Sequence, residues 1–158
     1  MIYLAPFVQT PPDVIERMLA LAAIRSGDVL YDLGSGDGRV VIAAARRHGI
    51  RAAGFEIDPD LVRDSRQAIA AAALTGLAEI HERDILTADL TGATVVTLYL
   101  QPDTNLRLRP ALFRQLRPGA RVVSHEFGMG RWRPHRVERM TDADAVPRTI
   151  YLWRIGER

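Results

Sequence analysis

Hydrophobic positions along this chain follow two alternating patterns. Short, nearly continuous apolar runs predict buried strands, whereas an apolar repeat of three to four residues predicts helices. The expected strands lie at 28–33, 52–57, 77–82, 93–100, 120–127, 135–140 and 149–155. The expected helices begin at Asp13, Arg39 and Pro59, and a fourth follows Asn105, is interrupted at Pro110 and resumes as far as Leu116. Strands and helices therefore alternate over most of the chain.

This alternation predicts the α/β class, with a mostly parallel sheet between two helical layers, closed by a terminal strand pair. The run 93–100 is almost wholly apolar, which is typical of a central strand buried on both faces. Only seven residues, 128–134, separate two expected strands, too few for a crossover helix. The following strand therefore enters antiparallel, or one face of the sheet stays uncovered there, at an oligomer contact or where a large substrate approaches.

At 158 residues the chain is expected to form one domain, 1–158. Within it, residues 1–25 comprise a proline-rich leader and the first helix. The leader is either a plain segment packed on the domain or a lid across a ligand site, which would give Phe7 a ligand to cover.

Three glycines at alternate positions, Gly34, Gly36 and Gly38, follow a strand that ends near Asp32, and a helix begins directly after them. A turn without Cβ atoms lets a ligand lie against backbone N–H groups at a helix N-terminus. Dinucleotide sites use G-x-G-x-x-G, and Arg39 stands where that pattern needs glycine. The spacing resembles instead the first motif of S-adenosylmethionine (SAM) methyltransferases, and a purely structural turn is the alternative.

Acidic residues also stand where other strands end. Glu56 follows Gly38 by 18 residues, at the end of the neighbouring strand, where a carboxylate can accept hydrogen bonds from a ribose diol. Asp84 can accept a hydrogen bond from the exocyclic amine of adenine while Ile85 covers a ring face. Without the neighbouring motifs, Asp84 would be read as an ordinary turn residue. Because ligands of such sheets bind beyond the carboxyl ends of the strands, these features converge on one crevice, and SAM is the predicted cofactor.

Composition narrows the remaining chemistry. The chain has no cysteine, and its four histidines show no metal-ligand spacing, so no metal site is expected. No apolar run is long enough to span a membrane and no signal pattern opens the chain, so a cytoplasmic protein is expected.

Charge is unevenly distributed. Residues 1–100 carry nine arginines against 13 acids, residues 101–158 carry 12 against six, and there is no lysine. This asymmetry reflects either a coding bias or a basic face for an acidic partner, nucleic acid included.

Six segments together resemble a narrower family. They are the leader Pro6–Pro11, VLYDLGSGDGR at 29–39, FEID at 55–58, ATVVTLYLQPDTN at 93–105, RVVSHEF at 121–127 and TIYLWRIGE at 149–157. They are similar to the small non-SET protein lysine methyltransferases, which include a broad-specificity archaeal enzyme and mitochondrial enzymes acting on ATP synthase and related carriers. The resemblance covers nearly the whole chain and implies a Rossmann-like SAM methyltransferase fold, with S-adenosyl-L-homocysteine as the product.

The resemblance also implies residue roles. The cofactor would be bound by residues of the glycine loop and of the strand ends: Asp32, Gly34, Ser35, Gly36, Gly38, Glu56, Ile57, Asp84, Ile85 and Thr97. The substrate channel would be formed by Phe7, Thr10, Tyr99, Gln101, Pro102 and Trp132. Gln9 stands where the family's leader has proline.

Methyl transfer to lysine needs a deprotonated amine, which an apolar channel beside a cationic sulfonium favours. Tyr99 is the candidate catalytic residue; His125 and Glu126 are further candidates for a base, and His125 is equally well explained as structural. The predicted partner is a protein with an accessible lysine, and the protein itself is expected to be a monomer or dimer. The alternatives are a methyltransferase acting on RNA, DNA or a small molecule, and a SAM-binding protein without turnover.

Overall fold

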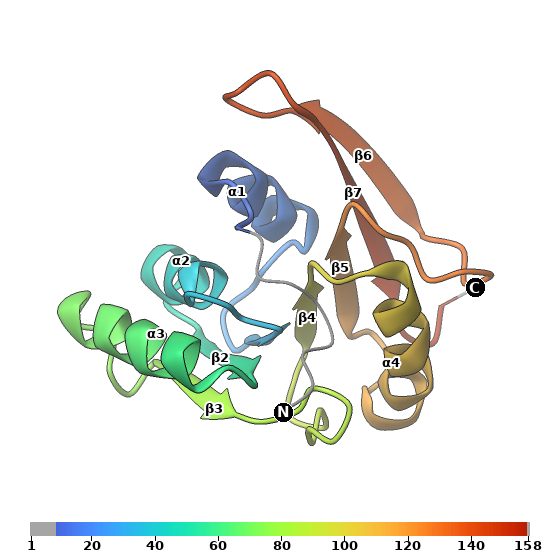
Figure 1. The fold of residues 1–158 in the computed structure, drawn as a ribbon. Coiled ribbons are helices and arrows are strands. Elements are labelled where there is room, and N and C mark those ends of the chain that lie inside the picture. Colours follow the sequence, from blue (N-terminus) through green and yellow to red (C-terminus); the bar gives the residue numbers. More distant parts are fainter. Residues whose placement is uncertain (1–8, 158) are drawn as a thin grey trace.

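A computed structural model describes residues 9–157, which form a seven-stranded sheet flanked by four helices (Figure 1). The strand order is β3-β2-β1-β4-β5-β7-β6. The elements are α1 (Pro12–Leu21), β1 (Val29–Leu33), α2 (Arg39–His48), β2 (Arg51–Glu56), α3 (Pro59–Ala71), β3 (Ala78–Glu82), β4 (Val95–Leu98), α4 (Pro102–Gln115), β5 (Arg121–His125), β6 (Arg136–Thr141) and β7 (Pro147–Arg154). The predicted Rossmann-like α/β architecture is confirmed.

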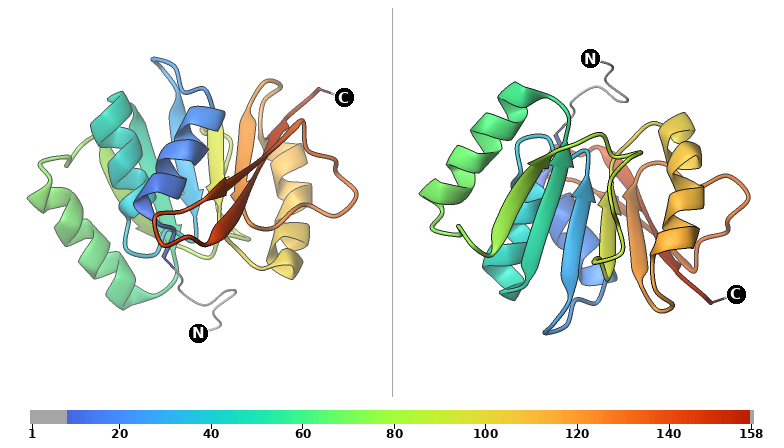
Figure 2. Two further views of the ribbon diagram at one scale, coloured as in Figure 1. Left: turned by 90° about the horizontal axis from the view of Figure 1, so that it is seen from above. Right: turned by 90° about the horizontal axis from the view of Figure 1, so that it is seen from below.

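The helices cover the two faces of the sheet unequally (Figure 2). The apolar sides of α1, α2 and α3 share one core with inward residues of the strands, among them Leu30, Val95 and Val123. On the opposite face α4 and the connection 83–94 form a second core with Leu33, Val96 and other strand residues. All four residues of β4 and all five of β5 are buried, as expected for central strands covered on both faces.

Local sequence signals account for the helix boundaries. Gly38 precedes α2 with φ +82° and Gly49 ends it with φ +63°, both in the left-handed region that favours glycine. The Asp58 side chain accepts the N–H of Asp60 at 2.9 Å, which caps α3 one residue before Pro59.

The prediction that the fourth helix is interrupted at Pro110 is wrong, because α4 runs without a break from Pro102 to Gln115. Proline removes one N–H from the helix, and here its ring lies on the exposed outer side of α4, where water can satisfy the carbonyl left without a donor. The helix therefore continues through it.

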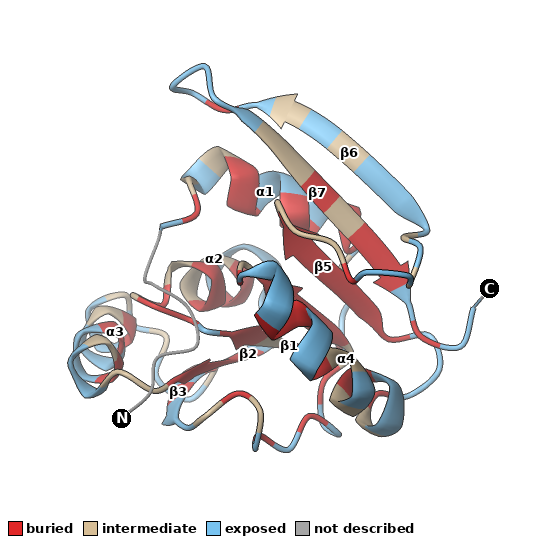
Figure 3. Ribbon diagram, turned by 45° about the vertical axis from the view of Figure 1, so that its right-hand side comes forward, coloured by how far each residue is buried: buried red, intermediate tan, exposed pale blue. Residues whose placement is uncertain are grey.

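The two terminal strands are placed differently from one expectation. The strand entering antiparallel is not β6, which follows the short connection, but β7, which pairs antiparallel with both β5 and β6. The reason lies in side-chain polarity: β7 contributes the buried Ile150, Leu152 and Trp153, whereas no residue of β6 is buried. Figure 3 shows β6 as a largely exposed edge, which agrees with the alternative of an uncovered part of the sheet.

None of the four helices within residues 9–157 combines the length and the apolar character that a membrane span requires. In the same range no three His, Asp or Glu side chains gather as ligands for a metal ion.

Candidate functional site

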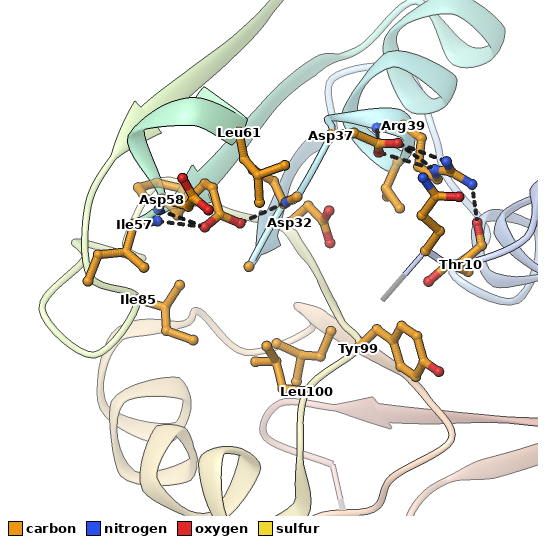
Figure 4. Close-up of a pocket in the computed structure, with 18 of the residues that line it drawn as sticks. Thr10, Asp32, Asp37, Arg39, Ile57, Asp58, Leu61, Ile85, Tyr99 and Leu100 are labelled. Atoms are coloured by element: carbon orange, nitrogen blue, oxygen red, sulfur yellow. Dashed lines mark hydrogen bonds and ion pairs between the residues drawn. The ribbon is translucent and has the colours of Figure 1, made fainter. Parts of the chain in front are cut away.

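A pocket of about 340 Å³ opens at the carboxyl ends of β1, β2 and β4 (Figure 4). This volume lies in the range usual for small-molecule and cofactor sites. The lining comes from the segment before α1, the glycine loop, the ends of β2 and β4 and the turn after β3: Gln9, Thr10, Met18, Asp32, Gly34–Asp37, Arg39, Val40, Phe55–Asp58, Leu61, Arg83–Ile85 and Leu98–Leu100. We call the part around Glu56, Ile57, Leu61 and Ile85 the Glu56 end, and the part around Thr10 and Tyr99 the Tyr99 end.

The glycine loop is tied to the neighbouring strand by its backbone. The N–H groups of Gly34 and Ser35 both donate to the carbonyl of Phe55, at 2.8 and 3.0 Å. Gly34 has φ +80°, and a Cβ there would lie 2.9 Å from Leu100 Cδ2. A Cβ on Gly54 would lie 2.5 Å from the side chain of Ser35, so glycine in β2 makes room for the loop. The Ser35 hydroxyl is buried and finds no partner within residues 9–157.

Glu56 is held by three backbone N–H groups. One carboxylate oxygen accepts from Gly36 and the other from both Ile57 and Asp58, each at 2.9 Å. The side chain is nearly buried, so its position in the pocket wall is well defined. A carboxylate has about four acceptor sites, and this one therefore retains capacity for a ligand hydroxyl.

Asp32 lies in the middle of the pocket at the end of β1 (Figure 4). Its Oδ1 accepts the Thr97 hydroxyl at 2.8 Å. Burial, together with the negative charges of Glu56 and Asp37, raises the pKa of Asp32 to about 7, although the Thr97 hydrogen bond acts in the opposite direction. A cationic group bound beside Asp32 would favour its ionised form. Thr97 is itself fully buried and supports Asp32 from outside the pocket lining.

The Glu56 end is apolar around its carboxylates. Ile57, Leu61 and Ile85 line it, and Figure 4 shows their side chains on the side of the pocket away from Tyr99. Asp84 uses Oδ1 to accept the Leu86 N–H at 2.9 Å, which shapes the turn. Its second oxygen makes no such bond to the turn. This end could therefore bind a flat apolar ring that carries a donor at its edge.

At the Tyr99 end, side chains hold one another. Arg39 forms an ion pair with Asp37 at 2.8 Å and donates to the Thr10 carbonyl at 3.1 Å. The Tyr99 ring stacks on His125 with centroids 3.9 Å apart. His125 is fully buried, and burial together with the charge of Arg148 lowers its pKa to about 4, against the weaker opposite effect of Asp142. His125 is therefore neutral at physiological pH.

Most of the residues expected at the site lie in the pocket lining, and the others lie elsewhere. Gly38 caps α2 outside the lining, and Gln101 and Pro102 open α4 beyond it. Phe7 is outside the described residues. Trp132 is not in the lining, because its ring packs between Phe113 and Trp153, with centroids at 4.5 and 5.5 Å.

Glu126, a candidate base, also lies outside the lining. Its carboxylate accepts the Thr149 N–H at 3.1 Å, which ties it to β7.

Several lining residues had not been expected at the site, among them Arg39, Asp58 and Leu61. Asp58 directly follows Ile57, so its position beside a predicted residue was an available signal. For Arg39, whose partner is Asp37 two residues earlier, the ion pair could not be read from the pattern of apolar positions.

Known proteins resemble this chain over most of its length. Residues 32–136 match the model of the ANTKMT methyltransferase domain. A protein-lysine N-methyltransferase of Saccharolobus islandicus is 40% identical over 153 residues, which cover 96% of this chain and 94% of that protein. The adenine nucleotide translocase lysine N-methyltransferase of Mus musculus is 35% identical over 130 residues, 82% of this chain but only 56% of that longer protein.

Among the solved structures that resemble this chain, one is described with a different methyl acceptor. A crystal structure described as an RNA methyltransferase from Salinibacter ruber in complex with S-adenosyl-L-homocysteine is 53% identical, with a TM-score of 0.88, covering 96% of this chain and 95% of that one. The C-terminal domain of a precorrin-6Y C5,15-methyltransferase from Rhodobacter capsulatus shares the fold, at 18% identity and a TM-score of 0.79, covering 96% of this chain and 94% of that one.

Proposed function

Because the chain belongs to the family of the ANTKMT methyltransferase domain, we propose that it transfers methyl groups from SAM to the ε-amine of lysines in other proteins. The observation that carries the choice of acceptor is the 40% identity to a protein-lysine N-methyltransferase over nearly the full length of both chains. The mouse relative, a lysine N-methyltransferase as well, supports the same acceptor.

The pocket suits this cofactor chemically. Asp32 offers a carboxylate to the amino group of the methionyl part, Glu56 offers acceptor sites to the ribose hydroxyls, and Ile57 and Ile85 offer apolar surface to the adenine. The second carboxylate oxygen of Asp84 can accept a hydrogen bond from the exocyclic amine of the adenine. The Ser35 hydroxyl, which has no partner within residues 9–157, is a buried polar group for which a bound ligand would supply one.

When bound, SAM supplies a methyl group on a positively charged sulfur. The chain contributes alignment of the acceptor, and an oriented encounter is worth up to about 7–11 kcal/mol of the barrier. Tyr99, Leu98 and Leu100 give the Tyr99 end an apolar wall, which disfavours a charged amine and so favours the neutral, nucleophilic form of lysine. Tyr99 and Thr10 would form the inner channel, with Gln101 and Pro102 in its outer part.

A second candidate function, methylation of RNA, has its own support. The relative described as an RNA methyltransferase is 53% identical, more than the lysine-specific relatives described above. Arg131 and Arg133 are exposed and form no ion pair inside the described part of the chain, so a basic surface is available. Against it, β4 is followed by Gln101-Pro102-Asp103 and not by the Asn/Asp-Pro-Pro-aromatic sequence common in enzymes that methylate base amino groups.

Labelling with SAM that carries a tritiated methyl group distinguishes these acceptors. The protein is incubated with cell lysate, and the products are treated with protease or nuclease and hydrolysed for chromatography. We expect radioactive methyl-lysine; label released only by nuclease would replace the lysine proposal with the RNA one. Label in small molecules would indicate a small-molecule substrate, and no label in any fraction would indicate binding without turnover.

Two features make this assay sharp. The chain contains no lysine, so radioactive ε-methyl-lysine cannot come from the protein itself. Lysate whose lysines have been blocked by acetylation is the matched control and should lose the label.

We also propose that the protein acts in the cytoplasm as a monomer or dimer. Cell fractionation tests the first part of this proposal and light scattering the second.

A further inference from the structure

A chain of four side chains leads from the β6–β7 connection to the Tyr99 end of the pocket. Arg148 Nε donates to Asp142 Oδ2 at 2.9 Å, and Arg148 Nη1 lies 3.5 Å from His125 Nε2. On the other side of the imidazole, His125 Nδ1 lies 3.3 Å from the Thr10 hydroxyl. Thr10 lines the pocket, whereas the other three side chains lie behind it.

The far end of this chain is firmly anchored. Asp142 Oδ1 accepts the N–H groups of Asp144 and Val146, both at 2.9 Å, so its carboxylate is fixed within its own turn. Its side chain is 1% exposed and that of Arg148 is 18% exposed. The Arg148 guanidinium is thus held in one orientation by a partner that cannot easily move.

Chemistry decides which imidazole nitrogen carries the proton. Arginine has only donors, so His125 Nε2 must be the acceptor in the contact with Arg148. The proton of the neutral ring then resides on Nδ1, which donates to the Thr10 oxygen. Consequently the hydroxyl proton of Thr10 is directed away from His125. Both contacts are at the long end of the hydrogen-bond range, as is common in sites that tighten when substrate binds.

The same arginine also bears on Tyr99. The Tyr99 ring stacks on His125 with an interplanar angle of 29°. Arg148 loses hydration by burial, but Asp142 and the nearby Tyr99 hydroxyl outweigh this effect and raise its pKa, so it stays charged. The groups that face His125 are therefore Thr10, Tyr99, Arg148 and, behind Arg148, Asp142.

We propose that Arg148 is a positioning residue for methyl transfer: anchored by Asp142, it holds His125 in the Nδ1–H form and thereby orients Thr10 and Tyr99 toward the acceptor. The consequence for the acceptor rests on the proposed methyltransferase function. The position of the proton on His125 does not depend on that function, so two separate measurements test the proposal.

The first measurement is a long-range proton–nitrogen correlation spectrum of uniformly ¹⁵N-labelled protein, with His125 assigned by the loss of its signals in His125→Gln. We expect the neutral Nδ1–H tautomer from pH 5 to 8. In Arg148→Met the Nε2 acceptor loses its donor and the lowering effect of the arginine charge disappears, so the Nε2–H form or the protonated ring should appear. An Nδ1–H tautomer that persists unchanged in Arg148→Met would overturn the proposal.

The second measurement is the initial rate of tritium incorporation into lysate protein at saturating SAM. We expect Arg148→Met and Thr10→Val each to lower the rate about 10-fold, a loss typical of misplaced reacting groups. Because both substitutions interrupt the same chain of four side chains, the double variant should be no slower than the slower single variant. Rate losses that multiply to about 100-fold would show that Arg148 and Thr10 act independently and would contradict the proposal.

Matched variants separate positioning from folding. Arg139→Met removes an exposed arginine from β6 and should leave both measurements unchanged. Arg148→Lys keeps the charge, and Asp142→Asn keeps Arg148 but weakens its anchor, so both should show smaller changes in the same direction even if Arg148→Met folds poorly. The calorimetric affinity for SAM should stay within about twofold in every variant that acts only through the acceptor. If lysate protein is not labelled by the unaltered protein, the methyltransferase proposal fails while the spectrum still decides the state of His125.

Discussion

At the Glu56 end of the pocket, backbone N–H groups hold the carboxylates, whereas at the Tyr99 end side chains hold other side chains. Glu56 is fixed by Gly36, Ile57 and Asp58, and Asp84 by the N–H of Leu86. Thr10, by contrast, meets His125 across 115 residues of sequence. The Glu56 end therefore depends on local backbone geometry that many sequences can form. The Tyr99 end depends on the identity of a few distant side chains, so under the proposed function it is the end at which acceptor specificity would change.

The largest expected effect tests the Glu56 end. Glu56→Ala removes the carboxylate and leaves three N–H groups without their acceptor. Hydrogen bonds to charged groups are worth about 1.5–3 kcal/mol, so the affinity for SAM should fall about 100-fold in calorimetry. Glu82→Ala, at the exposed end of the neighbouring β3, is the matched control and should bind normally. Equal binding by both variants would remove Glu56 from the cofactor site.

A somewhat smaller effect is expected at the Tyr99 end. Tyr99→Ala removes the ring stacked on His125 and should slow labelling of lysate protein about 30-fold, a loss in the range for a displaced acceptor. The affinity for SAM should change by less than about threefold, in contrast to Glu56→Ala. Tyr99→Phe keeps the ring and should retain most of the rate; if it were as slow as Tyr99→Ala, the hydroxyl would be a catalytic acid or base.

Asp32 lies between the two ends and gives a pH dependence. Burial and the charges of Glu56 and Asp37 raise its pKa to about 7, so it is increasingly protonated as the pH falls below 7. If the cationic cofactor needs the ionised form, affinity should drop about 10-fold from pH 7.5 to 6, and binding near pH 6.5 should release protons. Asp32→Asn should bind more weakly and lose this pH dependence; an unchanged pH profile in that variant would assign the proton to another group.

The raised pKa of Asp32 also makes the stability of the fold depend on pH. The folded chain without ligand binds a proton at Asp32 that the unfolded chain loses near pH 4. The contribution of Asp32 to the free energy of unfolding should therefore decrease as the pH rises from 4 to 7. Denaturant titrations of Asp32→Asn, which lacks the titrating group, should show a weaker decrease over that window.

The smallest effect separates the two candidate acceptors. Replacing both Arg131 and Arg133 with glutamine removes two exposed charges outside the pocket. For a lysine acceptor we expect less than about a twofold change in protein labelling, since exposed charges contribute little to a local contact. For RNA, labelling should fall several-fold and lose part of its salt dependence, because phosphate contacts are electrostatic.

The difference between the Glu56 end and the Tyr99 end also explains which parts of the site could be predicted from the sequence. The glycine loop, Glu56 and the Asp58 cap are signalled by residues close to one another in sequence, and the structure brings them together in one wall. Trp132 carried no such signal: an aromatic residue in a short loop can face a substrate or pack on a helix, and the positions of Phe113 and Trp153 decided for packing. Arg148 was not expected near the site at all, because its role depends on β7 lying next to β5.

The position of β7 also sets an order of events during synthesis. Strands β1 to β4 and the Glu56 end come from roughly the first two thirds of the chain and pair in parallel, so they can assemble while the remainder is still being made. β7 emerges last, yet it must insert between β5 and β6, and it brings Arg148 with it. A nascent chain would thus acquire a cofactor pocket before it could align an acceptor, and methyl transfer would begin only when the sheet is complete.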